Sequence, residues 1–336
     1  MIILTNCLTD LADEGCLKVA NSLVKRIREK EPQTKVVTYG DSPKQGDVHV
    51  KTNKLMLNRK LLSLLRKEKE PVLYIPAVAK AHTMAARVFH LSLFAPKGIQ
   101  VIQVMSYPMG KLVKLLLKLS KARIFAFSKD SWQSFYDLIG EKAEYLKTGV
   151  DTQRFCPIPK EQKSALREKY GLPTDKPIVL HVGHLKAKRN VEKLLAANQN
   201  AHAVLVTSSY AEELKDQQLK EKLLASENFT LIDHYLPDIQ EIYQLSDVYL
   251  FPVVAFHNCI DVPLSAMEAA ACGIPIVTTP FGEMKELLGK PGFYEIDSFE
   301  PEKLSKLVET AASEGKDPRQ SVLEYDWNLA VSKVLL

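Results

Sequence analysis

The chain has 336 residues and a mass of 37.8 kDa, and 46% of its residues are apolar, 25% charged and 8% aromatic. These values are typical of globular proteins, they exclude collagen, a coiled coil and a mainly disordered chain, and the length suffices for two domains. The net charge of +5 is the sum of +12 over residues 1–150, with 25 Lys and Arg against 13 Asp and Glu, and −7 over the remainder, with 20 against 27.

Strand-like and helix-like runs alternate over the first half of the chain. Short apolar runs predict strands at residues 2–4, 36–39, 71–76, 99–105 and 124–127, and those at 71–76 and 99–105 are of the buried parallel kind. Amphipathic spacing predicts helices at residues 17–28, 55–67, 109–121 and 132–139. The leucines of the 55–67 helix are expected to fill one broad apolar arc, which comprises Leu55, Leu57, Leu61, Leu62, Leu64 and Leu65.

The alternation pauses at residues 149–159, where turn formers and two prolines predict a linker. It then restarts with predicted helices at 161–170 and 191–197 and with predicted strands at 177–183, 203–207, 229–232, 248–251 and 274–278. Two consecutive βαβ series indicate an α/β protein with two doubly wound domains. Ligands of such domains bind beyond the carboxyl ends of the strands, so we expect the site in a cleft between the domains.

The most informative segment is residues 261–279. Pro263 suits a first helical turn, Gly273 suits the residue after a helix, and residues 274–279 suit a strand. The N-terminal N–H groups of this helix could receive an anion such as a diphosphate, and Glu268, one turn inside, could accept hydrogen bonds from the hydroxyls of a ribose. The alternative is that Glu268 is an ordinary solvated helix glutamate.

A second segment, residues 182–190, places Gly183 at the end of a strand and a basic cluster before the next helix. It fits a phosphate-binding loop, with an exposed basic loop as the alternative. His181 lies within the strand itself, and we expect it to be a core residue.

Together these segments resemble the retaining glycosyltransferases of the large family numbered four, the glycosyl transferases group 1, which have the GT-B fold. Residues 149–157 resemble the family's interdomain GVDxxxFxP motif, residues 267–275 its LEAMACGxPV segment, and residues 183–189 its GRLxxxK segment. Trp327 resembles the start of the final helix, which in that fold returns to the first domain. The resemblance implies two doubly wound Rossmann-like domains that face each other across a cleft. It further implies an acceptor-binding domain over residues 1–148, a nucleotide-sugar domain over 149–324, and a C-terminal helix over about 325–336 that packs on the first.

The resemblance also implies hexose transfer from a UDP- or GDP-sugar to a lipid-linked or polysaccharide acceptor, with retained configuration and without a metal or other cofactor. The residues that match the donor-binding positions are Gly183, Glu268, Val262, Pro263, Leu264, Ser265, His234, Tyr235 and Leu236. The expected catalytic residues are Arg189, Lys188, His184 and Asp261. The acceptor-side candidates are Glu14, Gly15 and Ser106.

Three positions depart from the family pattern. Ile260 stands where the family has the first Glu of its Ex7E motif, and Asp261, Asn258 or His257 could substitute for that carboxylate. His184 replaces an Arg, and Ser106 replaces a His. These departures keep a second hypothesis open, a nucleotide-sugar-binding partner subunit of a glycosyltransferase complex with impaired catalysis.

Four lysines, at positions 111, 114, 118 and 121, fall on one narrow stripe of the predicted 109–121 helix. Lys111, Lys114, Lys118 and Lys121 could contact an anionic membrane surface, or the helix could be mostly buried with a solvated lysine stripe. A nucleic-acid partner is not expected, because residues 1–150 contain no recognisable nucleic-acid-binding module.

The chain is expected to be cytoplasmic, with peripheral attachment to the inner face of the membrane. Its five cysteines are scattered without CxxC spacing, and its longest apolar runs fall short of the roughly 18 residues of a membrane-spanning helix. Residues 1–4 have no basic stretch before their apolar side chains, so no signal peptide is expected.

Overall fold

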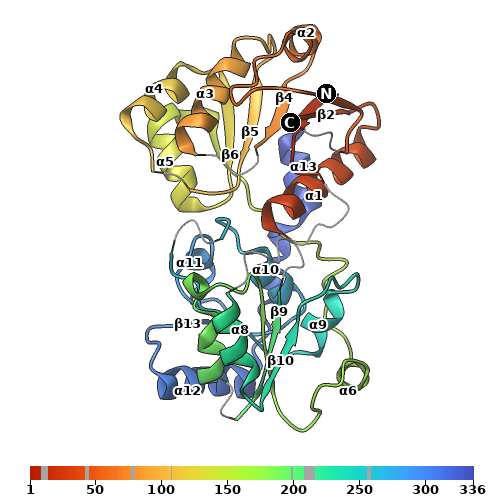
Figure 1. Cartoon of the computed structure of the whole chain (residues 1–336), viewed down its shortest axis with the longest axis vertical. Coiled ribbons are helices and arrows are strands. Elements are labelled where there is room, and N and C mark those ends of the chain that lie inside the picture. The colour runs from red at the N-terminus through yellow and green to blue at the C-terminus, as the bar shows by residue number, and fades with distance from the viewer. Residues whose placement is uncertain are drawn as a thin grey trace. The chain divides into compact units, whose positions relative to one another are not determined.

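The computed structural model describes residues 1–8, 14–41, 45–76, 80–106, 108–197, 200–207, 216–255 and 259–336 (Figure 1). Their contacts divide the chain into two compact units. The first unit contains Met1–Lys147 together with Trp327–Leu336, and the second contains Thr148–Asp326. Each unit is built around its own parallel β-sheet.

Within the described residues, the sheet of the first unit has seven parallel strands in the order β3-β2-β1-β4-β5-β6-β7. The strands are β1 (Ile2–Thr5), β2 (Lys35–Tyr39), β3 (Val48–Val50), β4 (Val72–Ile75), β5 (Ile99–Gln103), β6 (Ala122–Ala126) and β7 (Ala143–Tyr145). The helices are α1 (Gly15–Lys30), α2 (Arg59–Lys67), α3 (Ala81–Ser92), α4 (Lys111–Leu119), α5 (Lys129–Ile139), the 3-10 turn η1 (Gly140–Lys142) and α13 (Trp327–Val334).

Burial of apolar side chains explains these elements. Every residue of β1 and of β4 is buried, as expected for central strands of a parallel sheet that is covered on both faces. Helix α1 buries Val19, Leu23 and Ile27, which are spaced four residues apart on one face. Helix α13 packs against α1, beside which it lies in Figure 1, and Lys30 Nζ donates to Ser332 Oγ at 2.6 Å. The last helix therefore belongs to the first unit.

The described part of the second unit has a sheet of six parallel strands in the order β10-β9-β8-β11-β12-β13. The strands are β8 (Ile178–Val182), β9 (His202–Val206), β10 (Phe229–Ile232), β11 (Val248–Phe251), β12 (Ile276–Thr278) and β13 (Phe293–Glu295). The helices are α6 (Lys160–Lys169), α7 (Leu194–Ala197), α8 (Gln217–Leu224), α9 (Gln240–Leu245), α10 (Leu264–Ala271), α11 (Met284–Leu287) and α12 (Pro301–Glu314). Short 3-10 turns are η2 (Ala187–Arg189), η3 (Val191–Lys193), η5 (Arg319–Ser321) and η6 (Leu323–Tyr325).

In both sheets the strand order reverses beside the first strand of the unit. In chain order within its unit, the second sheet reads 3-2-1-4-5-6, which is the Rossmann arrangement. The expectation of two doubly wound domains is confirmed. The reversal lies between β8 and β11 in the second unit and between β1 and β4 in the first.

The predicted 55–67 helix is shorter than expected. Helix α2 begins at Arg59, because the Asn58 side chain accepts hydrogen bonds from the N–H groups of Lys60 and Leu61 and so caps the helix there. Met56 has a φ of 62°, which breaks any helix before that cap. Leu55 and Leu57 consequently lie outside the helix and are exposed, and the expectation that they help to fill its apolar arc was wrong.

Several elements were not anticipated. Strands β3, β7 and β13 have three residues each, which is too short for an alternation or an apolar run to stand out. Helices α3, α8, α9 and α12 were also missed.

Candidate functional site

The site is built at the carboxyl edge of the second sheet, where β8 and β11 lie side by side. Val248 pairs with Val179 and Tyr249 with Leu180, so the two strands run in register and end at the same edge. The chain leaves β8 through Gly183 toward η2, and it leaves β11 toward α10. Crossovers on opposite faces leave a crevice at such a reversal of strand order.

A buried tyrosine on β11 ties these two exits together. The Tyr249 hydroxyl lies 2.7 Å from Ser265 Oγ and 3.2 Å from the Val182 carbonyl oxygen, and it accepts the Val182 N–H at 3.3 Å. Burial raises the pKa of Tyr249, so its hydroxyl keeps its proton. The first turn of α10 is thereby held beside the end of β8.

The absence of a side chain at Gly183 makes room for an arginine. A Cβ at this position would lie 2.8 Å from Nη1 of Arg189 and 2.9 Å from Nε2 of His181. The guanidinium therefore covers the glycine at the end of β8. Asn190, in a left-handed conformation, fixes this turn by donating from Nδ2 to the Pro252 carbonyl oxygen at 2.9 Å.

Arg189 is half-buried, and within the described parts of the chain no Asp or Glu forms an ion pair with it. Beneath it, His181 is fully buried as expected, with Nδ1 2.8 Å from the Leu250 carbonyl oxygen. Burial, with a smaller contribution from the Arg189 charge, lowers the pKa of His181 to about 4. The histidine is neutral near pH 7, and the local charge is the positive charge of Arg189.

The other predicted basic residues lie on the same turn. His184 is half-buried after Gly183, and Lys188 is exposed on η2. The structure thus groups Gly183, His184, Lys188 and Arg189 at one corner of the sheet edge, where Lys188 and Arg189 supply positive charge for an anion.

Glu268 lies in the second turn of α10 and is only 5% exposed. Its Oε2 accepts the Tyr243 hydroxyl at 2.7 Å, and the Tyr243 ring meets the Phe155 ring edge-on at 5.6 Å between centroids. Burial and the Glu268 charge raise the pKa of Tyr243. The alternative of a solvated helix glutamate was wrong. Glu268 is a buried, oriented carboxylate below the first turn of α10.

The chain before α10 is held by close backbone contacts. The Asp261 carbonyl oxygen accepts the Glu283 N–H at 2.9 Å, and a Cβ on Gly282 would lie 2.1 Å from that oxygen. Gly149 lets the chain pass close to the Val262 side chain, whose Cγ1 would lie 2.8 Å from an added Cβ. The predicted donor-binding run is therefore fixed in place, and it comprises Val262, Pro263, Leu264 and Ser265.

Two of the positions near the missing Glu of the Ex7E motif, Ile260 and Asp261, lie among the described residues. Ile260 is 6% exposed and Asp261 3% exposed, so neither presents a solvated side chain at the surface. His257 and Asn258, the other suggested substitutes, lie outside the described residues.

The remaining predicted site residues are not brought into this cluster. His234 and Tyr235 are exposed and Leu236 is half-buried after β10, two strands away from β8, which corresponds to about 10 Å. Glu14 and Gly15 begin α1 in the first unit, and Ser106 follows β5 with its Oγ 2.7 Å from Ser131 Oγ. They share the carboxyl edge of the first sheet, but β4 separates their strands.

Three supporting residues were missed by sequence reasoning. Tyr243 and Tyr249 hold Glu268 and Ser265, and Arg319 donates to the carbonyl oxygens of Phe155 at 2.8 Å and Thr152 at 3.0 Å. A tyrosine in the otherwise apolar strand VYLF was the available signal, because a buried hydroxyl needs a partner. No comparable signal marked Tyr243 or Arg319, whose partners are distant in sequence.

Known proteins resemble this chain in sequence and in fold. Residues 162–324 match the family model of glycosyl transferases group 1. The second unit is a glycosyl transferases group 1 domain. The matched residues run from α6 to η6 and include all the site residues of this unit from Gly183 to Glu268.

Two curated relatives show how far the similarity extends. The sulfoquinovosyl transferase SQD2 of Arabidopsis thaliana is 24% identical over 286 residues, which cover 78% of this chain and 51% of that protein. A GDP-mannose-dependent alpha-(1-6)-phosphatidylinositol monomannoside mannosyltransferase of Mycolicibacterium smegmatis is 29% identical over 164 residues, covering 44% of this chain and 42% of that protein. The chain spans about half the length of the curated relatives it matches.

Solved structures extend the likeness in fold to the whole chain. A glycosyltransferase from Rickettsia africae has a TM-score of 0.75 at 15% identity and covers 99% of this chain and 96% of its own. HepE from Anabaena, solved in complex with UDP, has a TM-score of 0.75 at 14% identity and covers 99% of this chain and 98% of its own. The predicted GT-B fold class is confirmed.

Neither a membrane-spanning helix nor a metal-binding cluster occurs among the described residues. They contain no helix that is both long and apolar enough to cross a bilayer. They also contain no group of three or more His, Cys, Asp or Glu side chains arranged to hold a metal ion.

Proposed function

We propose that the chain is a glycosyltransferase that moves a hexose from a UDP- or GDP-sugar to a lipid-linked or polysaccharide acceptor, with retention of anomeric configuration. The observation that carries this proposal is Arg189, a half-buried guanidinium without an ion pair in the described structure, placed over Gly183 at the reversal of strand order. An uncompensated cation at this edge, beside the first turn of α10, suits a diphosphate.

The proposed donor pose follows from the order of the groups. The diphosphate lies between Arg189 and the N–H groups of the first turn of α10, whose first residues have no partner within the helix. Glu268 then accepts from the ribose hydroxyls, while Tyr243 holds its other side. The base lies toward His234, Tyr235 and Leu236, along the same sheet edge.

Catalysis in this proposal is mainly electrostatic. As the bond between the sugar and the diphosphate breaks, negative charge grows on the leaving phosphate oxygens, and Arg189, Lys188, His184 and the α10 N–H groups stabilise it. The acceptor hydroxyl attacks the same face of the sugar and gives its proton to a leaving phosphate oxygen. No metal enters this scheme, and Asp261 is the carboxylate proposed to serve the transferred sugar in place of the Glu that Ile260 replaces.

The acceptor is proposed to bind the first unit. Its basic character supports an anionic acceptor or surface, because residues 1–150 carry a net charge of +12. The names of the relatives support a glycolipid, since one acts on phosphatidylinositol monomannoside. Glu14, Gly15 and Ser106 are the acceptor-side candidates. Lys111, Lys114, Lys118 and Lys121 are proposed to face anionic headgroups on the inner face of a membrane, in cell-envelope glycolipid or polysaccharide synthesis.

A donor panel tests the proposal. The full chain is incubated with UDP-, GDP- and ADP-sugars, with and without a phosphatidylinositol or polyprenyl-phosphate acceptor, and the released nucleoside diphosphate is quantified by chromatography. The proposal predicts release from one UDP- or GDP-sugar that depends on the acceptor and persists in EDTA. Binding of a nucleotide sugar without release under any condition would instead support the impaired partner subunit.

A further inference from the structure

Helix α4 exposes apolar side chains that the first unit does not cover. Leu112, Leu115 and Leu119, the leucine ridge, are 61%, 53% and 59% exposed. Val113 and Leu117 are the buried residues of α4, and they attach it to the unit beside α3 and α5. The alternative that this helix is mostly buried was therefore wrong.

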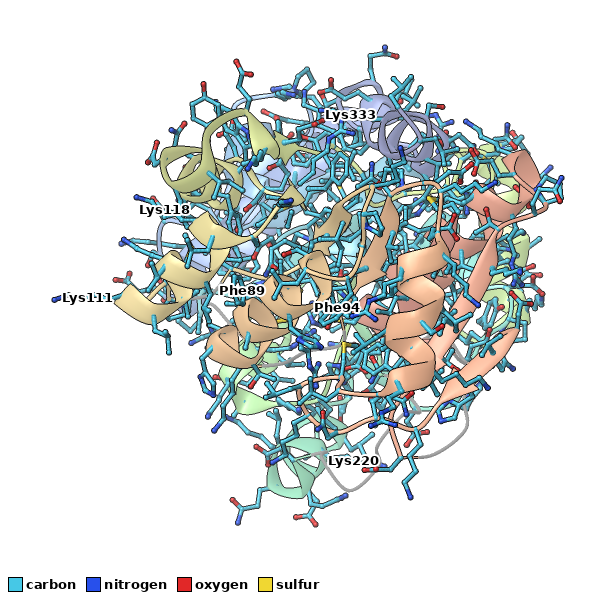
Figure 2. The ribbon with its side chains drawn as sticks, turned by 90° about the horizontal axis from the view of Figure 1, so that it is seen from above. Phe89, Phe94, Lys111, Lys118, Lys220 and Lys333 are labelled. Carbon is cyan, nitrogen blue, oxygen red and sulfur yellow. The ribbon has the colours of Figure 1, made fainter. Side chains whose placement is uncertain are left out.

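The exposed residues of α4 are ordered by chemistry around the helix. At about 100° per residue, the leucine ridge occupies an arc of about 60°, and Lys111, Lys114 and Lys118 occupy an adjacent arc of about 60°. We call these three residues the lysine flank. All three are exposed, and Figure 2 shows Lys111 and Lys118 at the outer left edge, with Lys111 directed away from the ribbon.

We propose that α4 is the membrane-docking element of the protein, in which the leucine ridge inserts among the acyl chains of an anionic bilayer while the lysine flank binds the headgroups. The inference deepens the acceptor side of the proposed function, and it goes beyond charge alone because it assigns an apolar insertion. A short helix with an apolar stripe beside lysines has the composition of an interfacial helix.

Charge decides between the occupants that could cover this surface. The helix itself contains no acidic residue, and among the described residues that line the hollow beside Lys114 only Asp137 of α5 is acidic. A second copy of the chain, docked by the same face, would bring two lysine flanks together, which is repulsive. An anionic bilayer suits both the leucine ridge and the lysine flank, because its apolar layer and its negative headgroups lie within a few ångströms of each other.

Co-sedimentation with vesicles tests this inference on the full chain. The vesicles contain one part phosphatidylglycerol to two parts phosphatidylcholine, and phosphatidylcholine alone is the neutral comparison. Replacing the leucine ridge by L112S, L115S and L119S together should weaken binding on the order of a hundredfold, at roughly fivefold per half-buried leucine. Replacing the lysine flank by K111Q, K114Q and K118Q together should also weaken binding to the anionic vesicles about a hundredfold, at about fivefold for each lysine.

Matched controls and a direct insertion signal complete the design. Leu224 on α8 and Leu329 on α13 are 52% and 56% exposed, so L224S and L329S remove equally exposed leucines outside α4 and should bind vesicles like the wild type. L115W should show a blue-shifted tryptophan emission on addition of the anionic vesicles, which adsorption through charge alone would not produce. Nucleotide-sugar binding should be unchanged in all these variants, so a failure here leaves the donor site unaffected.

Three results would overturn the inference: wild-type protein that stays in the supernatant at low salt, a leucine-ridge variant that binds like the wild type, or an unshifted emission for vesicle-bound L115W. A leucine-ridge variant that converts a lipid-free dimer to a monomer in light scattering would assign the ridge to a second copy and would equally overturn it.

Discussion

A methyl group at position 183 tests the arrangement at the end of β8. In the Gly183→Ala variant the new Cβ would lie 2.8 Å from Nη1 of Arg189 and 2.9 Å from Nε2 of His181, and both distances are too short for a real contact. His181 has little freedom to move, because its ring contacts the rings of Tyr249 and Phe251 and its Nδ1 lies 2.8 Å from the Leu250 carbonyl oxygen. The guanidinium of Arg189, which lies at the end of a flexible side chain, must move instead.

Two consequences follow for Gly183→Ala. Crowding against the buried His181 should lower the free energy of unfolding by about 1–3 kcal/mol, the usual cost of an overpacked site. Displacement of the guanidinium should weaken nucleoside diphosphate binding about tenfold, in line with loss of a charged hydrogen bond. Urea unfolding and calorimetric titration measure the two effects separately.

Gly110→Ala is the matched control, because a Cβ there would meet nothing within 4 Å. Its stability should change by less than about 1 kcal/mol, and its nucleotide affinity should not change. In an Arg189→Ala background, Gly183→Ala should cause no further loss of affinity. Wild-type stability and wild-type affinity in Gly183→Ala would refute the placement of Arg189 over the glycine.

Three further predictions concern the same cluster. Arg189→Ala should lower kcat by about 100- to 1000-fold while affinity for the donor falls only about tenfold, since its charge matters most as the diphosphate leaves; equal losses in steady-state and binding measurements would not fit. Glu268→Ala should reduce affinity for nucleoside diphosphates by about 1–3 kcal/mol, as ribose hydroxyls lose their acceptor, with circular dichroism unchanged; undiminished affinity in calorimetry would reject this role. Burial lowers the pKa of His181 to about 4, so as the pH falls below about 6.5 this histidine takes up its proton in the unfolded state before it does so in the folded state. The free energy of unfolding should therefore fall by about 2 kcal/mol between pH 7 and pH 5. His181→Phe should lose correspondingly less over that interval in urea unfolding, and equal losses in both proteins would contradict the burial of a neutral imidazole.

The doubly wound fold could be predicted because each of its longer strands has a signal in its own short stretch of sequence. Runs such as VLYI in β4 and VYLF in β11 are continuously apolar, as buried parallel strands must be, and turn formers separate them. The start of α2 was missed for an equally local reason, since the apolar spacing from Leu55 continued through Asn58, whose side chain caps the helix.

The candidate site was only partly predictable. Gly183 and Arg189 could be proposed because a glycine after a strand and a basic turn are adjacent in sequence. The bonds from Tyr243 to Glu268 and from Tyr249 to Ser265 join residues 25 and 16 positions apart, and nothing in either segment names the partner. The exposure of Leu112, Leu115 and Leu119 could likewise not be predicted, because the sequence of a leucine-rich helix with one lysine stripe is compatible with a buried helix and with an exposed one.

Calorimetric titration of UDP, GDP and ADP into the wild type, Arg189→Ala and Lys176→Ala tests the central claim most directly. Lys176 precedes β8, at the opposite edge of the sheet from Gly183, and is the matched basic control. UDP or GDP should bind the wild type and Lys176→Ala with equal affinity, and it should bind Arg189→Ala about tenfold more weakly. Failure of all three diphosphates to bind the wild type, or equal binding by Arg189→Ala, would contradict a nucleotide-sugar site at the end of β8.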